Sequence, residues 1–209
     1  MSDFRTTKTN RQYINTAFDK ELYKNVIDTR FNPFTDLPIT NASEFTQVLR
    51  RIVNTSPRRI ENAKQQIMTR EKIIVFYNYT YELDILKEIC QELNRAFYQW
   101  NGQKHEPIPD AAEWVYLVQY TAGAEGWNCI TTDTILFYSL NYSYRVMEQS
   151  EGRINRVNTS FNDLFYVYLK SPASIDDAIE RSIRSKKKFN ERNWIDKECP
   201  NLKEIFSEH

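Results

Sequence analysis

Apolar residues in the first third of the chain recur every three or four positions, the spacing that places them on one face of an amphipathic helix. A polar stretch with two prolines, 32–41, interrupts this pattern and indicates a turn-rich break. Serine in front of an apolar run is a typical N-cap, and Pro57 suits a first helical position. The pattern therefore predicts three helices: 18–30, a second capped by Ser43, and a third over 56–70 capped by Ser56.

Beyond residue 71, continuous apolar runs alternate with stretches of helical spacing. Such runs are typical of parallel strands that are covered on both faces. The predicted strands span 72–79, 96–100, 114–120, 134–139 and 163–169. The predicted helices span 81–93, 143–156 and 175–189. Strands that alternate with helices indicate βαβ units and an α/β fold with a parallel sheet.

These patterns divide the chain into four expected segments. Residues 1–17 are polar and predict a flexible or linker segment, and 18–70 a helical N-terminal part. Residues 71–195 form the α/β domain, and 196–209 a C-terminal tail. The hydrophobic share of 41%, with 14% aromatic residues, is enough apolar material for one sizeable core.

No membrane-spanning or secretory segment is apparent in the sequence. It has no run of about 18 apolar residues, and its first residues lack the apolar stretch of a signal peptide. The three cysteines are widely spaced without a CxxC pair, and there are only two histidines. We therefore predict a cytoplasmic protein with no membrane partner, no disulfide framework and no metal site.

Charge is balanced overall but clustered locally. Basic and acidic residues number 28 each, so the formal net charge of zero offers no general attraction for nucleic acid. Solvated faces are the usual place for clusters of basic residues, and phosphate contacts are the alternative. The two basic clusters are Arg50, Arg51, Arg58 and Arg59, and later Arg181, Arg184, Lys186, Lys187 and Lys188.

The first motif that carries chemistry is TAGAEGWN, residues 121–128, directly after a predicted strand. Ligands on parallel sheets bind beyond the carboxyl ends of the strands. Glycines in this loop let backbone N–H groups approach a phosphate closely, and Thr121 can donate its hydroxyl. The alternative is an ordinary tight turn between a strand and the next element.

The second motif is the polar segment 149–156, QSEGRINR. Two arginines three positions apart, Arg153 and Arg156, would share one face of the predicted helix. Paired guanidinium groups suit the spread charge of a phosphoryl-transfer transition state. The alternative is an exposed helix face on which the arginines pair with neighbouring glutamates. Gly152 is unusual there, because glycine costs about 1 kcal/mol within a helix, so it indicates close backbone approach.

Together these segments resemble a known family. TAGAEGWN, TDTILFYS, Gln149 and the GRxxR pair resemble motifs V and VI of superfamily 2 helicases, and IIVFYNY resembles motif IV. The QxxGRxxR form is similar to the Swi/Snf-type branch. Stretches such as VYLVQYTAGAEGWNC and NYSYRVMEQSEGRINRVNT are closer still to phage-encoded DEAD-like helicases. The resemblance covers about residues 18–195, with several motifs in the correct order.

The resemblance implies a three-layer, RecA-like helicase C-terminal domain with a helical N-terminal extension. Arg153 and Arg156 would then be catalytic arginines that face the γ-phosphate of ATP held by a first domain. Gly126 and Asn128 would lie near the ribose and phosphate side of that interface. Gln149 would couple the nucleotide to the nucleic-acid groove.

The same resemblance implies a nucleic-acid surface. Thr121, with Asn78 and Tyr79 of motif IV, would contact the backbone of the tracked strand. Asn101 and Gly102 match a family loop on the same face. Contacts to phosphates suit a translocating motor, because they do not depend on base sequence. The expected partners are nucleic acid, DNA rather than RNA, and an N-terminal RecA-like ATPase domain, in cis or in trans.

The sequence lacks a GxxxxGK[ST] phosphate loop and an Asp-Glu pair at the end of a buried strand. The chain alone should therefore be inactive, with ATP and Mg²⁺ bound only together with the missing first domain. It would be either the excised C-terminal half of a longer helicase, in a bacterial host cell if phage-encoded, or a natural stand-alone domain. A non-catalytic module that binds nucleic acid or a protein is the alternative function. A small-molecule enzyme is disfavoured, because no GxSxG elbow or positioned histidine occurs.

Overall fold

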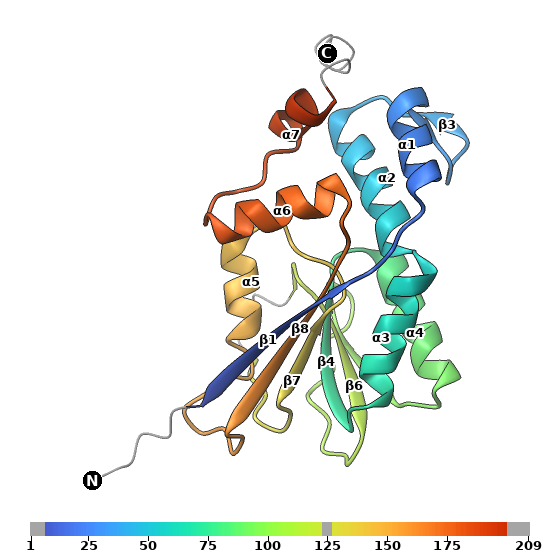
Figure 1. Cartoon of the computed structure of the whole chain (residues 1–209). Helices are drawn as coiled ribbons and strands as arrows, with labels where there is room; N and C mark the ends of the chain where they lie inside the picture. Colours follow the sequence, from blue (N-terminus) through green and yellow to red (C-terminus); the bar gives the residue numbers. More distant parts are fainter. Residues whose placement is uncertain (1–6, 123–126, 200–209) are drawn as a thin grey trace.

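A six-stranded parallel sheet forms the centre of the protein (Figure 1). The computed structural model describes residues 7–122 and 127–199. The strands follow the order β1-β8-β7-β4-β6-β5 across the sheet, and every neighbouring pair is parallel. Their bounds are β1 Lys8–Asn15, β4 Lys72–Tyr77, β5 Phe97–Trp100, β6 Trp114–Gln119, β7 Thr134–Phe137 and β8 Asp163–Lys170.

Helices cover both faces of this sheet and the carboxyl ends of its strands (Figure 1). On one face lie α3, Pro57–Met68, and α4, Thr80–Glu92. On the other lies α5, Tyr144–Glu151. Beyond the carboxyl ends lie α1 Lys20–Thr29, α2 Ala42–Asn54, α6 Ser174–Arg184 and α7 Glu191–Glu198, with a small antiparallel hairpin of β2 Phe31–Asn32 and β3 Leu37–Pro38 after α1.

The alternation of side chains along each strand creates two hydrophobic cores. In β4, Ile73 and Val75 pack with α3 and α4, whereas Ile74 and Phe76 face the opposite side. All four side chains are fully buried. The second core continues from the sheet into α1, α2, α5, α6 and α7. Burial on both faces explains why the strands are continuous apolar runs.

The predicted fold class is confirmed: the protein is a three-layer α/β domain with a parallel sheet and a mostly helical N-terminal part. Ser56 caps α3, since its side chain accepts a hydrogen bond from the backbone N–H of Arg59, and Pro57 is the first helical residue. The predicted cap Ser43 is wrong. Asn41 caps α2, accepting from the N–H of Glu44 at 2.8 Å, and Ser43 lies inside the first turn.

Two boundaries differ from those predicted. Residues 8–15, expected in a flexible or linker segment, form the edge strand β1, which pairs with β8 along its whole length. The strand's side chains are mostly exposed, and backbone pairing with β8 leaves no apolar pattern in its sequence. Residues 191–198 form α7, which crosses the expected start of the C-terminal tail at 196, because Trp194 and Ile195 are buried against the helical layer.

Two helices are shorter than predicted. The helix expected over 143–156 ends at Glu151, and the one expected over 175–189 ends at Arg184. In both cases apolar residues beyond the helix still pack in the core, Ile154 in the first and Phe189 in the second. Their spacing extended the apparent periodicity past the true helix ends.

The first basic cluster is not a solvated face. Arg50 and Arg59 are buried, with 1% and 0% of their surface exposed, whereas Arg58 is exposed. Burial of a guanidinium requires hydrogen-bond partners. Both residues have several, which belong to the site described below. Within the described residues no helix is long and apolar enough to cross a membrane.

Candidate functional site

The two predicted catalytic arginines follow helix α5 rather than lying on it. The helix ends at Glu151 with Gly152 as its C-cap, so Arg153 and Arg156 belong to the segment that comes next. Gly152 has an ordinary helical backbone angle, φ −64°. A β-carbon there would meet only carbonyl oxygens of the same helix, the nearest at 3.4 Å. Within the described residues no other segment approaches this glycine closely, and the expected close approach stays a prediction.

Arg153 is fixed against the segment that follows β6. Its Nη1 donates a hydrogen bond to the carbonyl oxygen of Trp127 at 2.9 Å, and its guanidinium lies over the Trp127 ring, 5.3 Å from the centroid. Its own carbonyl oxygen accepts from the N–H of Cys129 at 3.0 Å. The exposed Asn128 lies between these two contacts, so the structure brings it beside Arg153. Gly126 lies outside the described residues.

We call Trp127, Asn128, Arg153 and Arg156 the arginine surface. Burial lowers the pKa of the Arg153 guanidinium, and the positive charge of Arg156 lowers it further. Arg156 is partly exposed, and within the described residues it forms no ion pair. Two like charges held near each other create a site that favours an anion.

The neighbouring glutamates Glu148 and Glu151 contact other residues. Glu148 accepts a hydrogen bond from the Tyr144 hydroxyl at 2.7 Å, and Glu151 pairs with Arg11 of β1 at 2.5 Å. Within the described residues Arg156 forms no ion pair with either glutamate, so the expected alternative is not found for this arginine. Gln149 is exposed in the last turn of α5, and no side-chain hydrogen bond holds it within the described residues.

The predicted nucleic-acid residues lie elsewhere, at the carboxyl ends of β4, β6 and β5. Thr121 follows β6 and is exposed. Asn101 and Gly102 follow β5. The Asn101 side chain accepts from the N–H groups of Gln103 and Lys104, at 2.9 and 3.0 Å, and so shapes its own turn. Gly102 is exposed, and a β-carbon there would meet nothing within 4 Å.

Asn78 is engaged inside the protein. Its Nδ2 donates to Ser139 Oγ at 2.7 Å and to the carbonyl oxygen of Leu140 at 3.1 Å. Its Oδ1 accepts from Asn141 Nδ2 at 2.8 Å. These bonds tie the end of β4 to the end of β7. The side chain predicted to contact nucleic acid therefore has its donors and acceptor occupied by the fold.

Tyr79 is half-buried between aromatic and cationic neighbours. Its ring stacks on Tyr81 at 5.2 Å, and the guanidinium of Arg50 lies 5.4 Å from its centroid. Arg50 also donates to the Tyr79 hydroxyl at 3.3 Å and to the carbonyl oxygen of Leu140 at 2.6 Å. Burial raises the pKa of Tyr79 well above its ordinary value. Only part of this residue is therefore available to a ligand.

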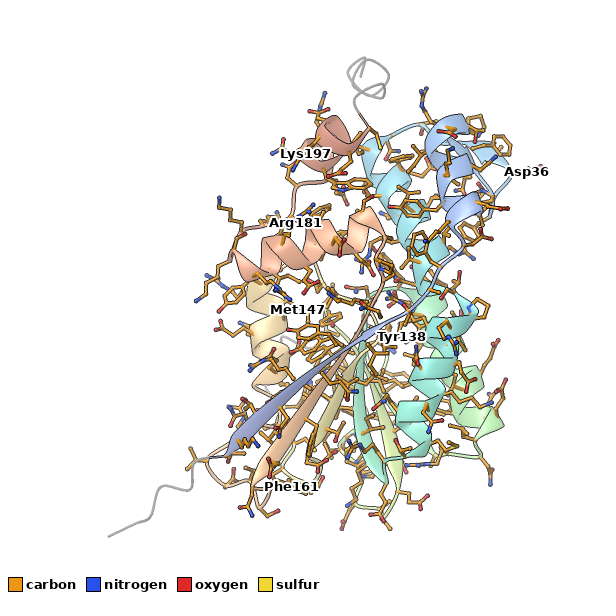
Figure 2. The ribbon with its side chains drawn as sticks, in the orientation of Figure 1. Asp36, Tyr138, Met147, Phe161, Arg181 and Lys197 are labelled. Atoms are coloured by element: carbon orange, nitrogen blue, oxygen red, sulfur yellow. The ribbon has the colours of Figure 1, made fainter. Side chains whose placement is uncertain are left out.

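A buried polar network that the sequence did not reveal supports this edge. Arg59 forms an ion pair with Asp176 at 2.8 Å and donates to Asn54 Oδ1 at 2.8 Å. Glu82 accepts from Asn54 Nδ2 at 2.7 Å, from the N–H of Asn78 at 2.7 Å and from Ser139 Oγ at 3.0 Å. We call this the carboxyl-edge network: Asn54, Arg59, Asn78, Glu82, Ser139 and Asp176. Arg59 also donates to the carbonyl oxygen of Tyr138, and the Tyr138 label in Figure 2 shows where the network lies.

The sequence held one signal for this network. Arg59 is spaced four and eight residues from Ala63 and Ile67, which are both buried in α3, so it belongs to the buried stripe of that helix. For Trp127 the signal was a large aromatic residue within a polar loop. Among the described residues no group of three or more histidine, cysteine, aspartate or glutamate side chains could hold a metal ion.

The overall arrangement matches a solved structure. The C-terminal part of the Fun30 ATPase domain superposes with a TM-score of 0.69, covering 88% of this chain and 91% of that one. The chain has the fold of that half-domain. The two sequences are 14% identical, so the match establishes the fold alone.

Curated relatives point to helicase-like proteins. The chain is 25% identical over 126 residues to the chromodomain-helicase-DNA-binding protein 3 homolog of Caenorhabditis elegans, covering 56% of this chain. It is 23% identical over 178 residues to the human DNA repair and recombination protein RAD54B, covering 79% of this chain. It spans only 7% and 18% of the lengths of these relatives. No family model matches.

These similarities bear out the Swi/Snf-type helicase resemblance at the level of the C-terminal ATPase half-domain. The likeness to phage-encoded helicases stays a prediction, since the two relatives named come from a nematode and from human. In the Fun30-like fold, the arginine surface lies on the α5 side of the sheet, and the predicted nucleic-acid residues lie at the carboxyl edge.

Proposed function

We propose that this chain is the C-terminal half of a DNA-dependent ATPase motor of the Swi/Snf helicase type. In this proposal Arg153 and Arg156 complete an ATP site whose remaining parts belong to a first ATPase domain. The observation that carries the proposal is the fixed position of Arg153, whose guanidinium donates to the carbonyl oxygen of Trp127 and lies over its ring, while the charge of Arg156 acts on it strongly enough to lower its pKa. The negative charge of a phosphate group beside these two residues would interact favourably with both guanidinium groups.

The surroundings of the arginines suit a domain interface. Val157 is fully exposed, and Ile130 is 37% exposed, although both are large apolar side chains. Asn128 and Gln149 are exposed polar side chains on the same two segments. A partner domain that covered these residues would exclude water around the arginines, which strengthens their interaction with a phosphate.

The first domain would hold ATP and Mg²⁺, because the sequence of this chain lacks the phosphate loop and the Asp-Glu pair that bind them. Bound there, the ion would neutralise part of the phosphate charge. This chain would supply its arginines to the γ-phosphate, with Gly126 and Asn128 beside them. Arg153 is positioned in advance by Trp127, and Arg156 is partly exposed.

The carboxyl edge would face DNA in this proposal. Thr121 offers an exposed hydroxyl to a phosphate, and Gly102 leaves room for a backbone to approach. Asn78 would position the edge through the strand-to-strand bonds described above, the half-buried Tyr79 would contribute its exposed part, and the buried Asn101 would shape the turn that carries Gly102. The names of both curated relatives include DNA, which favours DNA over RNA.

The test uses a protein that contains both ATPase domains in one reading frame. Arg153→Ala and Arg156→Ala should each lower DNA-stimulated ATP turnover by about 10³-fold, the usual worth of such an arginine, with a smaller change in ATP affinity. Arg58→Ala, an exposed arginine on α3, is the matched control and should leave turnover unchanged.

A structural role is separated from a catalytic one by thermal unfolding. Arg156→Ala should unfold at the same temperature as the parent, since Arg156 makes no ion pair within the described residues. Full turnover in both arginine variants would contradict the proposal. A gene without any upstream phosphate-loop domain would favour the non-catalytic binding module instead.

A further inference from the structure

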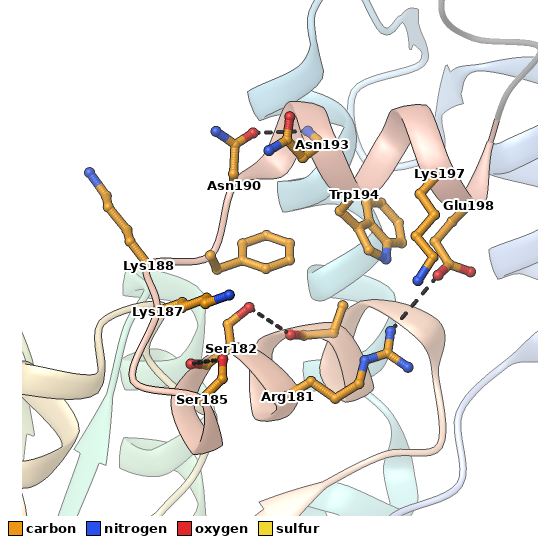
Figure 3. Close-up of a pocket in the computed structure, with 12 residues that line it drawn as sticks. Arg181, Ser182, Ser185, Lys187, Lys188, Asn190, Asn193, Trp194, Lys197 and Glu198 are labelled. Carbon is orange, nitrogen blue, oxygen red and sulfur yellow. Dashed lines mark hydrogen bonds and ion pairs between the residues drawn. The ribbon is translucent and has the colours of Figure 1, made fainter.

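The loop between α6 and α7 forms one wall of a basic groove. The opposite wall is the start of α5, and the groove has a volume of about 740 Å³. Figure 3 shows Lys187 and Lys188 on this loop, with Lys188 extending away from the helices. The residues that line the groove are Tyr142, Ser143, Tyr144, Arg145, Glu148, Lys186, Lys187 and Lys188.

Positive charge dominates this groove. Arg145 and the three lysines are exposed, against a single carboxylate, Glu148, which accepts the Tyr144 hydroxyl. Within the described part of the chain none of the four cations forms an ion pair. An excess of like charges in a concave surface raises the local concentration of anions.

The backbone fixes the lysine loop. The N–H of Lys186 donates to the carbonyl oxygen of Ile183 at 3.0 Å, and that of Lys187 to Ser182 at 2.9 Å. Lys186 has φ 55°, the left-handed conformation in which a helix usually ends on glycine. The chain thus keeps a lysine where glycine would be easier, and its ammonium lies 5.2 Å from the centre of the Tyr144 ring.

A second pocket adjoins the groove. It has a volume of about 640 Å³ and lies on the other side of Tyr142 and Lys188, which line both. It adds the exposed Arg192 and one acidic residue, Glu191. Because the two pockets share Tyr142 and Lys188, they form one path, and its positive charge is concentrated in the groove.

Aromatic and cationic contacts connect this path to the carboxyl edge. Tyr142 stacks on Phe189 at 5.0 Å, and the buried guanidinium of Arg50 lies 4.8 Å from the Tyr142 ring. The same guanidinium contacts Tyr79, which follows β4. The groove therefore begins where the predicted nucleic-acid surface ends, rather than on an unrelated face.

We propose that this lysine groove binds the sugar–phosphate backbone of DNA, which presupposes the DNA-dependent motor proposed above. Lysines and Arg145 would contact phosphates, and the tyrosines would pack on sugars or bases, independently of base sequence. An acidic protein segment is the competing ligand. The aromatic rings between the cations, and the continuity with the carboxyl edge, favour nucleic acid.

The experiment measures binding of this 209-residue chain to a fluorescein-labelled DNA of mixed sequence, single-stranded and duplex, by fluorescence anisotropy. Salt is varied between about 50 and 200 mM, because the slope of log Kd against log salt counts phosphate contacts. The groove variant is Lys186→Gly, Lys187→Gln and Lys188→Gln. The matched control removes the same charge from exposed lysines elsewhere, with Lys8→Gln, Lys20→Gln and Lys24→Gln.

The groove variant should weaken binding on the order of ten-fold or more and reduce the salt slope by about 2 to 3, whereas the control should change both by less. Lys186→Gly alone should unfold at the same or a higher temperature while binding DNA less tightly, a combination that a purely structural role would not produce.

Equal binding by the groove and control variants would overturn the inference, as would the absence of DNA binding by the parent chain. So would poly-glutamate that binds the parent more tightly than DNA and loses affinity in the groove variant. None of these outcomes depends on ATP turnover, so the arginine proposal stands or fails separately.

Discussion

The arginine surface and the carboxyl-edge network are both polar, but they differ in how completely the fold satisfies them. In the network, Arg59 and Glu82 are fully buried, and each finds partners on neighbouring elements. On the arginine surface, two cations lie near each other beside the exposed Val157. The first group is satisfied within the fold, whereas Arg156 of the second forms no ion pair within the described residues.

This difference separates positioning from binding. A polar group whose hydrogen bonds are complete loses stability when it is changed, because its partners are left buried and unpaired. A group that the fold leaves incomplete can be changed at little cost to stability, and its loss should appear only when a ligand is present. Three measurements at the carboxyl edge test whether its buried polar groups position the fold rather than bind a ligand.

The largest expected effect on stability comes from Arg59→Met. Asp176 would keep its buried charge without a counter-ion, which costs about 3–5 kcal/mol in the free energy of unfolding. Urea unfolding measures it. Arg58→Met, one residue away but exposed, is the control and should stay within about 0.5 kcal/mol of the parent. Equal stability of the two variants would show that the buried pair does not hold the edge.

A smaller loss is expected for Asn78→Ala, about 1–3 kcal/mol, because Ser139, Leu140 and Asn141 would lose hydrogen-bond partners. Thr121→Ala, at the same edge but exposed, should change stability by about 0.5 kcal/mol or less and weaken DNA binding instead. The opposite pattern, a stable Asn78 variant that has lost DNA affinity, would make Asn78 a direct ligand contact.

The smallest effect concerns the pH dependence of Glu82. Burial raises the pKa of this carboxyl above its ordinary value of 4.5. Its protonation therefore stabilises the folded state below pH 4.5, and this contribution is lost as the pH rises through the folded-state pKa.

Glu82→Gln removes that titration. The free energy of unfolding of the parent minus that of the variant should accordingly fall as the pH rises above 4.5, because only the parent loses the contribution of protonated Glu82. Glu88→Gln, an exposed carboxylate on the same helix, serves as the control and should have a smaller effect at every pH. A difference that grew with pH would mean that the hydrogen bonds from Asn78 and Ser139 outweigh burial.

Local pattern predicted most elements of this fold, because burial on one or both faces leaves a period in the sequence. The strands β4 to β8 lie where continuous apolar runs occur, and Ser56 with Pro57 marks the start of α3. Pattern failed for β1, whose stability comes from the backbone of β8 rather than from its own side chains. It also overran the end of α5, since Ile154 is buried without being helical.

The candidate sites divide in the same way. The sequence alone identified the residue types suited to phosphate chemistry, Arg153, Arg156 and the loop before Cys129, because such motifs are contiguous along the chain. Only the tertiary structure placed Trp127 against Arg153, closed Asn78 into a buried network, and brought Tyr142 together with the lysine loop. These pairings join residues far apart in sequence, and they depend on strand order and helix packing, which no local pattern encodes.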